Sequence, residues 1–411
     1  MNTFRKFTFV ITLLIGANTT AQIDIEKTIF SKMDINPQFE LWDGTETMLM
    51  GYTELLGGSI NLPSPILTFT EGDSVKLTLS NFSQAAPHTI HLHGLDVNQQ
   101  NDGVPHLSFE VEHLEEGDYY FKAPHPGTYL YHCHVVSSLH VQAGMYGLII
   151  VKPVDESNTT WTGGYTYDRE YAWLMSELDI NWHHDTIINH PHDPLAMNHT
   201  ILDYEPQYFL VNGKSEQQLN HEMTTITGHA NENIYLRLAN VGYFGNRIIF
   251  PSGLNTTIIA SDGRPLPTTE LSDTIEIMSG ERYGVLLNAS SELTELIQIE
   301  YFNLNTPQVT ENTQLISANI NGFLAIDNSE SKASIKIYPN PASDELTIDF
   351  KNLKIEKLDV YTILGEIIYS HCTIENKNNL ELNVNQWKNG VYLIKYTVQG
   401  KLMTKKLTIK K

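Results

Sequence analysis

The residues best suited to chemistry lie in two short runs of the chain. The first run, Pro87–Gly94, has three histidines, and the second, Tyr131–Met145, has three more together with a cysteine and a methionine. Thiolate, imidazole and thioether ligands together favour copper, and one Cys with two His and a distant Met describes a blue-copper electron-transfer site. A structural zinc site would need no methionine. We therefore predict a mononuclear copper site with the ligands His88, Cys133, His140 and Met145.

The remaining histidines of these runs form a second set with a regular spacing. His91 and His93 are two residues apart, and so are His132 and His134 on either side of Cys133. On a β-strand, residues two apart point to the same face. His132 and His134 are therefore expected to lie opposite the Cys133 side chain and to bind further metal ions together with His91 and His93. A thiolate ligand between two such histidines gives electrons a short covalent route between metal sites.

The elements that must position these side chains have the pattern of β-strands. From about Gln38 to Val154, short segments rich in β-branched and aromatic residues alternate with Gly, Pro, Asn and Asp, as in a β-sandwich. A polar stretch, Asp155–Gly164, precedes a second strand-rich region, Tyr167–Gly322. We predict an all-β protein with one sandwich at residues 35–154 and another at 165–325. His88 is placed on a strand, and Cys133, His140 and Met145 on the loop that joins the last two strands of the first sandwich.

Charge and the two termini indicate an exported protein. The net charge of −22 argues against a nucleic-acid partner. The N-terminus has the basic, apolar and small-residue regions of a signal peptide, predicted at residues 1–21. From Lys332 onward there are 13 lysines and 8 acidic residues, so this terminal module, predicted at 335–411, differs in charge from the rest. The second cysteine, Cys372, lies in that module, where we expect a small buried residue and no disulfide with Cys133.

The first sandwich resembles that of multicopper oxidases of the laccase type. The resemblance rests on the runs His91–Leu95, Asp102–Pro105 and Pro126–His132. It implies a cupredoxin-like Greek-key fold, type 1 copper on the mononuclear ligands and type 2 and type 3 copper on the second histidine set. The first domain in that family usually reads His-Ser-His where this chain has Cys133 between its two histidines. The chain thus resembles two-domain oxidases that hold type 1 copper in the first domain.

The second sandwich resembles the non-copper middle domain of the same family. This likeness rests on the motifs Tyr208–Lys214, Leu236–Gly242, Ser261–Leu266 and Ser279–Tyr283. The resemblance as a whole implies a laccase-like oxidase in which a small-molecule reductant gives up electrons at type 1 copper, and O2 is reduced to water at the type 2 and type 3 centre. It further implies three catalytic residues, with an exposed His140 where electrons enter, Cys133 as their route onward and Asp102 as a proton relay. The alternative for Asp102 is a plain turn former.

The number of histidines leaves alternatives open. A complete trinuclear centre in this family uses eight histidines, and the first sandwich supplies four. The others would come from a second subunit in a homo-oligomer or from the segment Trp182–His199, which holds five histidines, among them His190 and His192. That segment could also be a solvated insertion. With an incomplete centre the protein would be a blue-copper carrier. A copper nitrite reductase is a further alternative, weakened because His134 follows the cysteine and no Asp lies two residues before His91 or His93.

The C-terminal module resembles the type A sorting domain of the type IX secretion system. The resemblance rests on the Tyr-Pro-Asn-Pro opening at Tyr338–Pro341, on Asn389–Tyr392 and on the lysine-rich end. It implies a small β-sandwich, recognition by the type IX machinery, and a secreted or cell-surface protein. An adhesive or carbohydrate-binding sandwich would fit the size but not these motifs.

Overall fold

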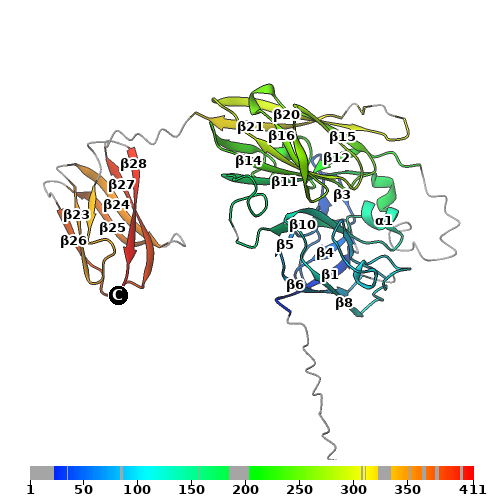
Figure 1. Cartoon of the computed structure of the whole chain (residues 1–411), viewed down its shortest axis with the longest axis horizontal. Coiled ribbons are helices and arrows are strands. Elements are labelled where there is room, and N and C mark those ends of the chain that lie inside the picture. The colour runs from blue at the N-terminus through cyan, green and yellow to red at the C-terminus, as the bar shows by residue number, and fades with distance from the viewer. Residues whose placement is uncertain are drawn as a thin grey trace, which may run out of the picture. The chain divides into compact units, whose positions relative to one another are not determined.

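The computed structural model describes most of the chain. The described residues are 23–34, 36–83, 87–155, 157–184, 203–306, 309–310, 312–322, 335–350, 353–362, 367–374, 379–398 and 401–411. The signal peptide predicted at residues 1–21 lies outside them. The chain forms two compact units, Met1–Phe323 and Leu324–Lys411. Nearly all regular structure is β-strand (Figure 1), which confirms the predicted all-β class, while the predicted domain boundaries stay predictions.

The first half of the larger unit is a sandwich of two four-stranded sheets. One sheet has the order β4 (Met50–Thr53), β1 (Ile25–Met33), β6 (Ser74–Asn81) and β8 (Glu116–Lys122). The other has the order β5 (Leu67–Thr70), β10 (Tyr146–Lys152), β9 (Gly127–His132) and β7 (His91–His93). A short hairpin, β2 (Phe39–Glu40) with β3 (Glu46–Thr47), precedes β4. Strand alternation builds the core, since Val75, Leu77 and Leu79 of β6 are buried in it.

Strand β9 has two different surroundings on its two faces. Tyr129 and Tyr131 point into the core of the first sandwich. Leu130, between them, belongs to a separate apolar cluster that includes Leu174 and Val241 of the second sandwich. The two-residue period of a strand thus places one face of β9 in a core and the other against the neighbouring sandwich.

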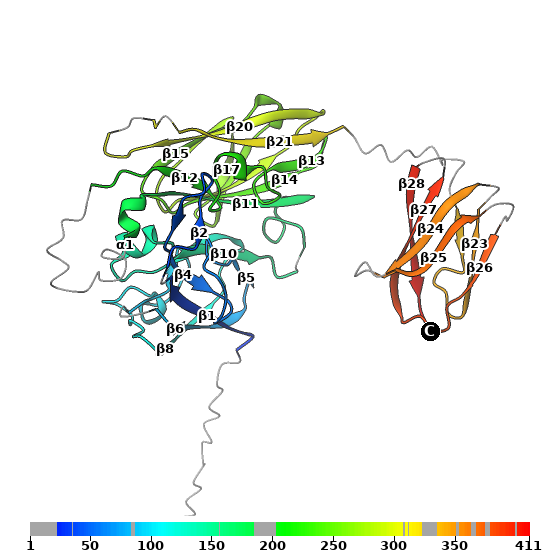
Figure 2. The same ribbon diagram turned by 180° about the vertical axis from the view of Figure 1, so that it is seen from behind.

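The second half of the larger unit is also a sandwich, with sheets of six and five strands. The six-stranded sheet has the order β12 (Tyr208–Val211), β11 (Arg169–Leu178), β14 (Ile234–Asn240), β19 (Arg282–Leu287), β16 (Thr257–Ser261) and β17 (Arg264–Leu271). The five-stranded sheet has the order β13 (Ile226–His229), β21 (Gln314–Asn321), β20 (Leu293–Phe302), β15 (Gly245–Ile249) and β18 (Thr274–Ile277). Its core is built around the fully buried Trp173. Figure 2 shows the same arrangement from behind.

Helices are few and short in the described residues. The one α-helix, α1 (Ser137–Gln142), lies between β9 and β10. The 3₁₀ helices are Gln99–Asn101, Ile180–His183, Glu216–Leu219 and Ser252–Leu254. No helix in this part of the chain is long and apolar enough to cross a membrane.

The smaller unit is a β-structure with a core of its own around Phe350 and Tyr396. A three-stranded sheet has the order β22 (Lys336–Tyr338), β23 (Glu345–Asp349) and β26 (Asn379–Asn383). A four-stranded sheet has the order β25 (Ile367–Ile374), β24 (Ile355–Thr362), β27 (Gly390–Val398) and β28 (Lys401–Ile409). Cys372 lies on β25, and its side chain is outside the described part, so its predicted burial is untested.

Candidate metal centre

The mononuclear ligands predicted from the sequence come together at one end of the first sandwich. The Cys133 Sγ lies 3.6 Å from His88 Nδ1 and 3.2 Å from His140 Nδ1. All three side chains are buried, and Met145 is fully buried in the same core. Cys133 leaves the end of β9, where its N–H donates to the Met145 carbonyl at 3.0 Å. This backbone bond brings the two ends of the predicted ligand loop side by side.

Two local details differ from the sequence predictions. His88 is not in a strand but makes an isolated bridge with Val111 just before β7. His140 was predicted to be exposed, and this is wrong, because its side chain is only 1% exposed. The reason is that His140 lies on α1, which packs against both sandwiches. Gln142 on the same helix donates to the Glu177 carbonyl of β11 at 3.2 Å.

The donor set of this first group fits copper. Two imidazole nitrogens and one thiol converge at distances that a single ion can span, with a thioether in the same core. Burial raises the pKa of the Cys133 thiol to about 11, so a thiolate there needs a bound cation to offset its desolvation.

The second histidine set lies on the opposite face of β9. Strand β7 pairs with β9 so that His91 is directly opposite His132. Ligand nitrogens of His91, His93 and His132 all lie within 4.8 Å of one another, and His93 Nδ1 is 3.3 Å from His132 Nε2. The His134 ring is 5.3 Å from that of His91, between centroids. The structure therefore brings three of the four predicted residues into one group, with His134 beside it.

Hydrogen bonds and burial prepare these imidazoles for a metal. Burial lowers the pKa of His93 to about 4 and that of His132 to about 3, so both rings are neutral near pH 7. His91 Nδ1–H donates to the Asp102 carbonyl at 2.8 Å, which leaves the other ring nitrogen as the ligand atom. The Asp102 carboxylate is 3.5 Å from the same Nδ1. The second set thus also fits copper, with the His91 imidazole oriented by the Asp102 carbonyl.

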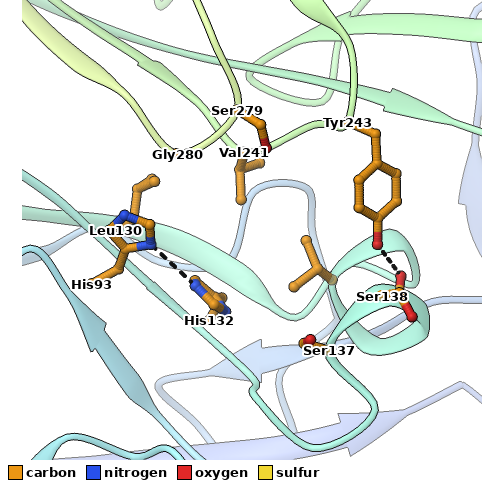
Figure 3. A pocket seen from close by; sticks show the side chains of 10 residues that line it. His93, Leu130, His132, Ser137, Ser138, Val241, Tyr243, Ser279 and Gly280 are labelled. Carbon is orange, nitrogen blue, oxygen red and sulfur yellow. Dashed lines mark hydrogen bonds between the residues drawn. The ribbon is translucent and has the colours of Figure 1, made fainter. Parts of the chain in front are cut away.

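A cavity of about 200 Å³ opens beside this second set. It is lined by His93 and His132 from the first sandwich and by residues of the second, among them Tyr243 and Gly280 (Figure 3). Sequence reasoning missed these second-sandwich residues. Gly280 belongs to the Ser279–Tyr283 motif, and Val241, which also lines the cavity, belongs to the Leu236–Gly242 motif. The signal in the sequence was therefore a pair of family motifs that were interpreted as purely structural.

The histidine-rich segment of the second sandwich is described only at its start. His183 is buried, and its Nδ1–H donates to the Met48 carbonyl at 2.7 Å. That bond ties the second sandwich to the first and assigns His183 a structural role. His190, His192 and His199 lie outside the described residues.

Three family models match the chain. A multicopper oxidase model matches residues 43–156, a second multicopper oxidase model matches 180–318, and a secretion system C-terminal sorting domain matches 336–410. The two oxidase models follow the first and second sandwiches, and the sorting model follows the smaller unit.

Curated relatives and solved structures agree with these matches. Copper resistance protein A of Escherichia coli is 28% identical over 300 residues, which are 62% of this chain and 46% of the relative. L-ascorbate oxidase of Nicotiana tabacum is 24% identical over 311 residues, which are 69% of this chain and 50% of the relative. The chain thus spans about half the length of the curated relatives it matches.

Among solved structures, the blue copper oxidase from Nitrosomonas europaea superposes with a TM-score of 0.55 at 26% identity, covering 72% of this chain and 86% of that one. A copper nitrite reductase from the same organism has a TM-score of 0.52 at 19% identity, covering 72% and 94% of the two chains, and so shares the fold. The two oxidase models span the two sandwiches of the larger unit. The chain belongs to the multicopper oxidase family and ends in a secretion system C-terminal sorting domain.

Proposed function

We propose that this chain is a copper-dependent oxidase that takes electrons from a small-molecule reductant at the His88, Cys133, His140 and Met145 set and reduces O2 to water at the second histidine set. Copper bound at both sets would supply the one-electron redox chemistry. Membership of the multicopper oxidase family supports this reaction class.

The observation that carries the proposal is the link between the two sets through Cys133. His132 precedes Cys133 directly in the chain, and its Nδ1–H donates to the Cys133 carbonyl at 3.0 Å. The Cys133 side chain points into the first core, while the His132 ring lines the cavity on the other face of β9. One peptide bond and one hydrogen bond therefore join the two donor sets.

The residues around the sets support roles in excluding water and in moving protons. Tyr52 and Tyr131, both fully buried, enclose the mononuclear set in the first core. The Asp102 side chain is 25% exposed and lies beside His91. It can therefore accept a proton from water and pass it toward the second set, which O2 reduction requires.

The second set needs further ligands, and we propose that they come from a second copy of the chain in a homo-oligomer. His190 and His192 of the same chain are the competing source. Light scattering combined with copper content separates the two: an oligomer whose copper content is unchanged by His190→Ala with His192→Ala supports the shared site. A monomer that loses copper in this variant supports the local source.

We also propose that the protein is exported by the type IX secretion machinery to the cell surface or the medium. The sorting domain at residues 336–410 supports this route. Cell fractionation of a chain truncated after Gly322 tests it, because the truncated chain should stay inside the cell envelope.

The test of the oxidase is copper content and electron paramagnetic resonance (EPR) on the copper-loaded protein. We expect a type 1 signal together with a type 2 signal and oxygen uptake with a reductant. Cys133→Ala should remove only the type 1 signal, and His93→Ala only the second signal. His113→Ala is the matched control, since His113 bonds to the Ser83 carbonyl and belongs to neither set.

Other outcomes would point to the alternative functions. A type 1 signal with about one copper per chain and no oxygen uptake would refute the oxidase and indicate an electron carrier. Reduction of nitrite in place of O2 would indicate a copper nitrite reductase.

A further inference from the structure

The helix that carries His140 is too short to hold its own position. α1 has six residues, and isolated helices of that length are unstable in water. Its N-cap residue, Val136, has a left-handed backbone with φ of 42° and provides no side-chain cap. This conformation is unfavourable for a β-branched residue. The position of His140 must therefore be fixed by contacts from outside the helix.

Two of these contacts come from the second sandwich. The Tyr243 hydroxyl, on the connection between β14 and β15, donates to the Ser138 carbonyl of α1 at 2.6 Å (Figure 3). At the other end of the helix, Gln142 donates to the Glu177 carbonyl at 3.2 Å. His140 lies between these two anchors in sequence. The anchor at Ser138 is a bond to a carbonyl in the first turn of the helix, and its geometry depends on where Tyr243 is held.

Tyr243 is in turn held by the side chain of Glu177. The Tyr243 N–H donates to Glu177 Oε1, and the Phe244 N–H donates to the same oxygen at 3.3 Å. The Tyr204 hydroxyl adds a third bond to Oε1 at 3.1 Å. A Cβ on Gly242 would overlap the Glu177 carboxylate, so the connection can approach this closely only with glycine there. Glu177 therefore fixes the backbone from which Tyr243 reaches α1.

We propose that Tyr243 is a positioning residue for His140, and that Glu177 acts through Tyr243. The second sandwich thereby contributes, together with the Met145 N–H that donates to the His140 carbonyl at 3.0 Å, to where His140 Nδ1 lies relative to Cys133 Sγ, a distance of 3.2 Å in this structure. The spectroscopic part of this inference rests on the proposed function, because it concerns His140 as a copper ligand. The structural part, the bracing of α1, does not depend on copper.

The test replaces Tyr243 by phenylalanine, which keeps the ring and removes the bond to Ser138. In the copper-loaded protein, we expect a shifted visible absorption maximum, a changed EPR hyperfine splitting and a changed type 1 reduction potential, at full copper content. Tyr301→Phe is the matched control. It also removes one phenol bond to a buried carbonyl of the second sandwich, that of Leu210 at 2.7 Å, but Tyr301 does not contact α1 in the described hydrogen bonds. The control should keep the wild-type spectrum and potential.

Glu177 provides a second pair of variants. Glu177→Ala should change the visible and EPR spectra in the same direction as Tyr243→Phe. Glu177→Gln should keep the wild-type spectra, because the amide oxygen can accept the hydrogen bonds from the Tyr243 and Phe244 N–H groups. A purely structural role of Glu177 would lower stability without this spectroscopic rescue.

Hydrogen exchange of the copper-free protein tests the bracing of α1 separately from the role of His140 as a copper ligand. Amides of residues 137–142 should exchange faster in Tyr243→Phe than in wild type or Tyr301→Phe. Exchange of these amides at the wild-type rate in Tyr243→Phe would overturn the inference. So would a wild-type spectrum of copper-loaded Tyr243→Phe, provided that the wild-type protein itself has the blue signal. A wild-type protein without any blue signal, but with faster exchange in Tyr243→Phe, would overturn the proposed function and the copper-ligand part of the inference, and leave the bracing of α1 supported.

Discussion

Glu177 should make the protein less stable as the pH rises from about 5 to about 7. Burial raises the pKa of Glu177 to about 7, above the usual value of 4.5, even though backbone N–H groups of Tyr243 and Phe244 donate to Oε1 and favour the charged form. Its other oxygen, Oε2, is buried and has no hydrogen-bond partner among the described residues. A neutral carboxyl with its proton on Oε2 fits this environment. A carboxylate does not, because its charge would be shared by Oε2, a buried oxygen without a described donor.

The sign and size follow from the two pKa values. Between about pH 4.5 and pH 7 the unfolded chain loses the Glu177 proton while the folded chain keeps it, so the free energy of unfolding falls as the pH rises. A difference of about 2.5 pKa units corresponds to about 3 kcal/mol, fully present below about pH 4.5 and lost as the pH passes about 7. The titratable groups facing Glu177 are tyrosines whose pKa values burial raises, so they stay neutral over this range: Tyr146, Tyr204, Tyr243 and Tyr301.

The measurement is urea unfolding of the full chain at several pH values between about 5 and 8, compared with Glu177→Gln. The amide stays neutral at every pH, so the stability of the variant relative to wild type should rise by about 2.5 kcal/mol across this interval, slightly less than the full difference because about pH 5 is already above the unfolded pKa. The other titrating groups are common to both proteins and cancel in the difference. A difference between the two proteins that is the same at about pH 5 and about pH 8 would refute the reasoning.

Two further predictions concern charged side chains of the larger unit. Glu170→Ala should lower the free energy of unfolding, measured by urea unfolding, by about 3–5 kcal/mol, because it leaves the fully buried Arg237, 2.6 Å from Glu170, without its anion. The control is Glu276→Ala, which removes the anion of the largely exposed pair with Arg247 and should lower the free energy of unfolding by at most about 1 kcal/mol. Asp102→Asn should keep the backbone bond to His91 and the copper content but slow oxygen uptake by about 10²-fold or more; an unchanged rate would assign Asp102 to the turn alone.

The sequence predicted much of the candidate site because the site depends on local periodicity. Two-residue spacing placed His91 with His93 and His132 with His134, and placed Cys133 on the other face. The structure follows that pattern, since Cys133 is in the first core and the His132 ring lines the cavity. A copper ligand set is also recognisable from residue types alone, because few other sites combine a thiol, imidazoles and a thioether.

The burial of His140 could not be predicted in this way. Its environment depends on Tyr243 and Glu177, which are about 100 and about 40 residues away and belong to another sandwich. Glu177 has no distinguishing sequence context, because an acidic residue within a strand usually faces solvent. Only the packing of β11 against the connection after β14 shows that its carboxyl is enclosed.

The second sandwich, which holds no metal-type group of its own among the described residues, still shapes both donor sets. Strand β9 is the reason: its inner face places Cys133 in the first core, and its outer face packs Leu130 against Val241 and opens the His132 ring to a shared cavity. We therefore expect a change in the second sandwich at this boundary to act on the cavity beside His132 and, through Tyr243 and α1, on His140. On this proposal the second sandwich helps to position ligands that all lie in the first sandwich. Variants such as Tyr243→Phe should therefore differ from ordinary destabilising variants in their copper spectra.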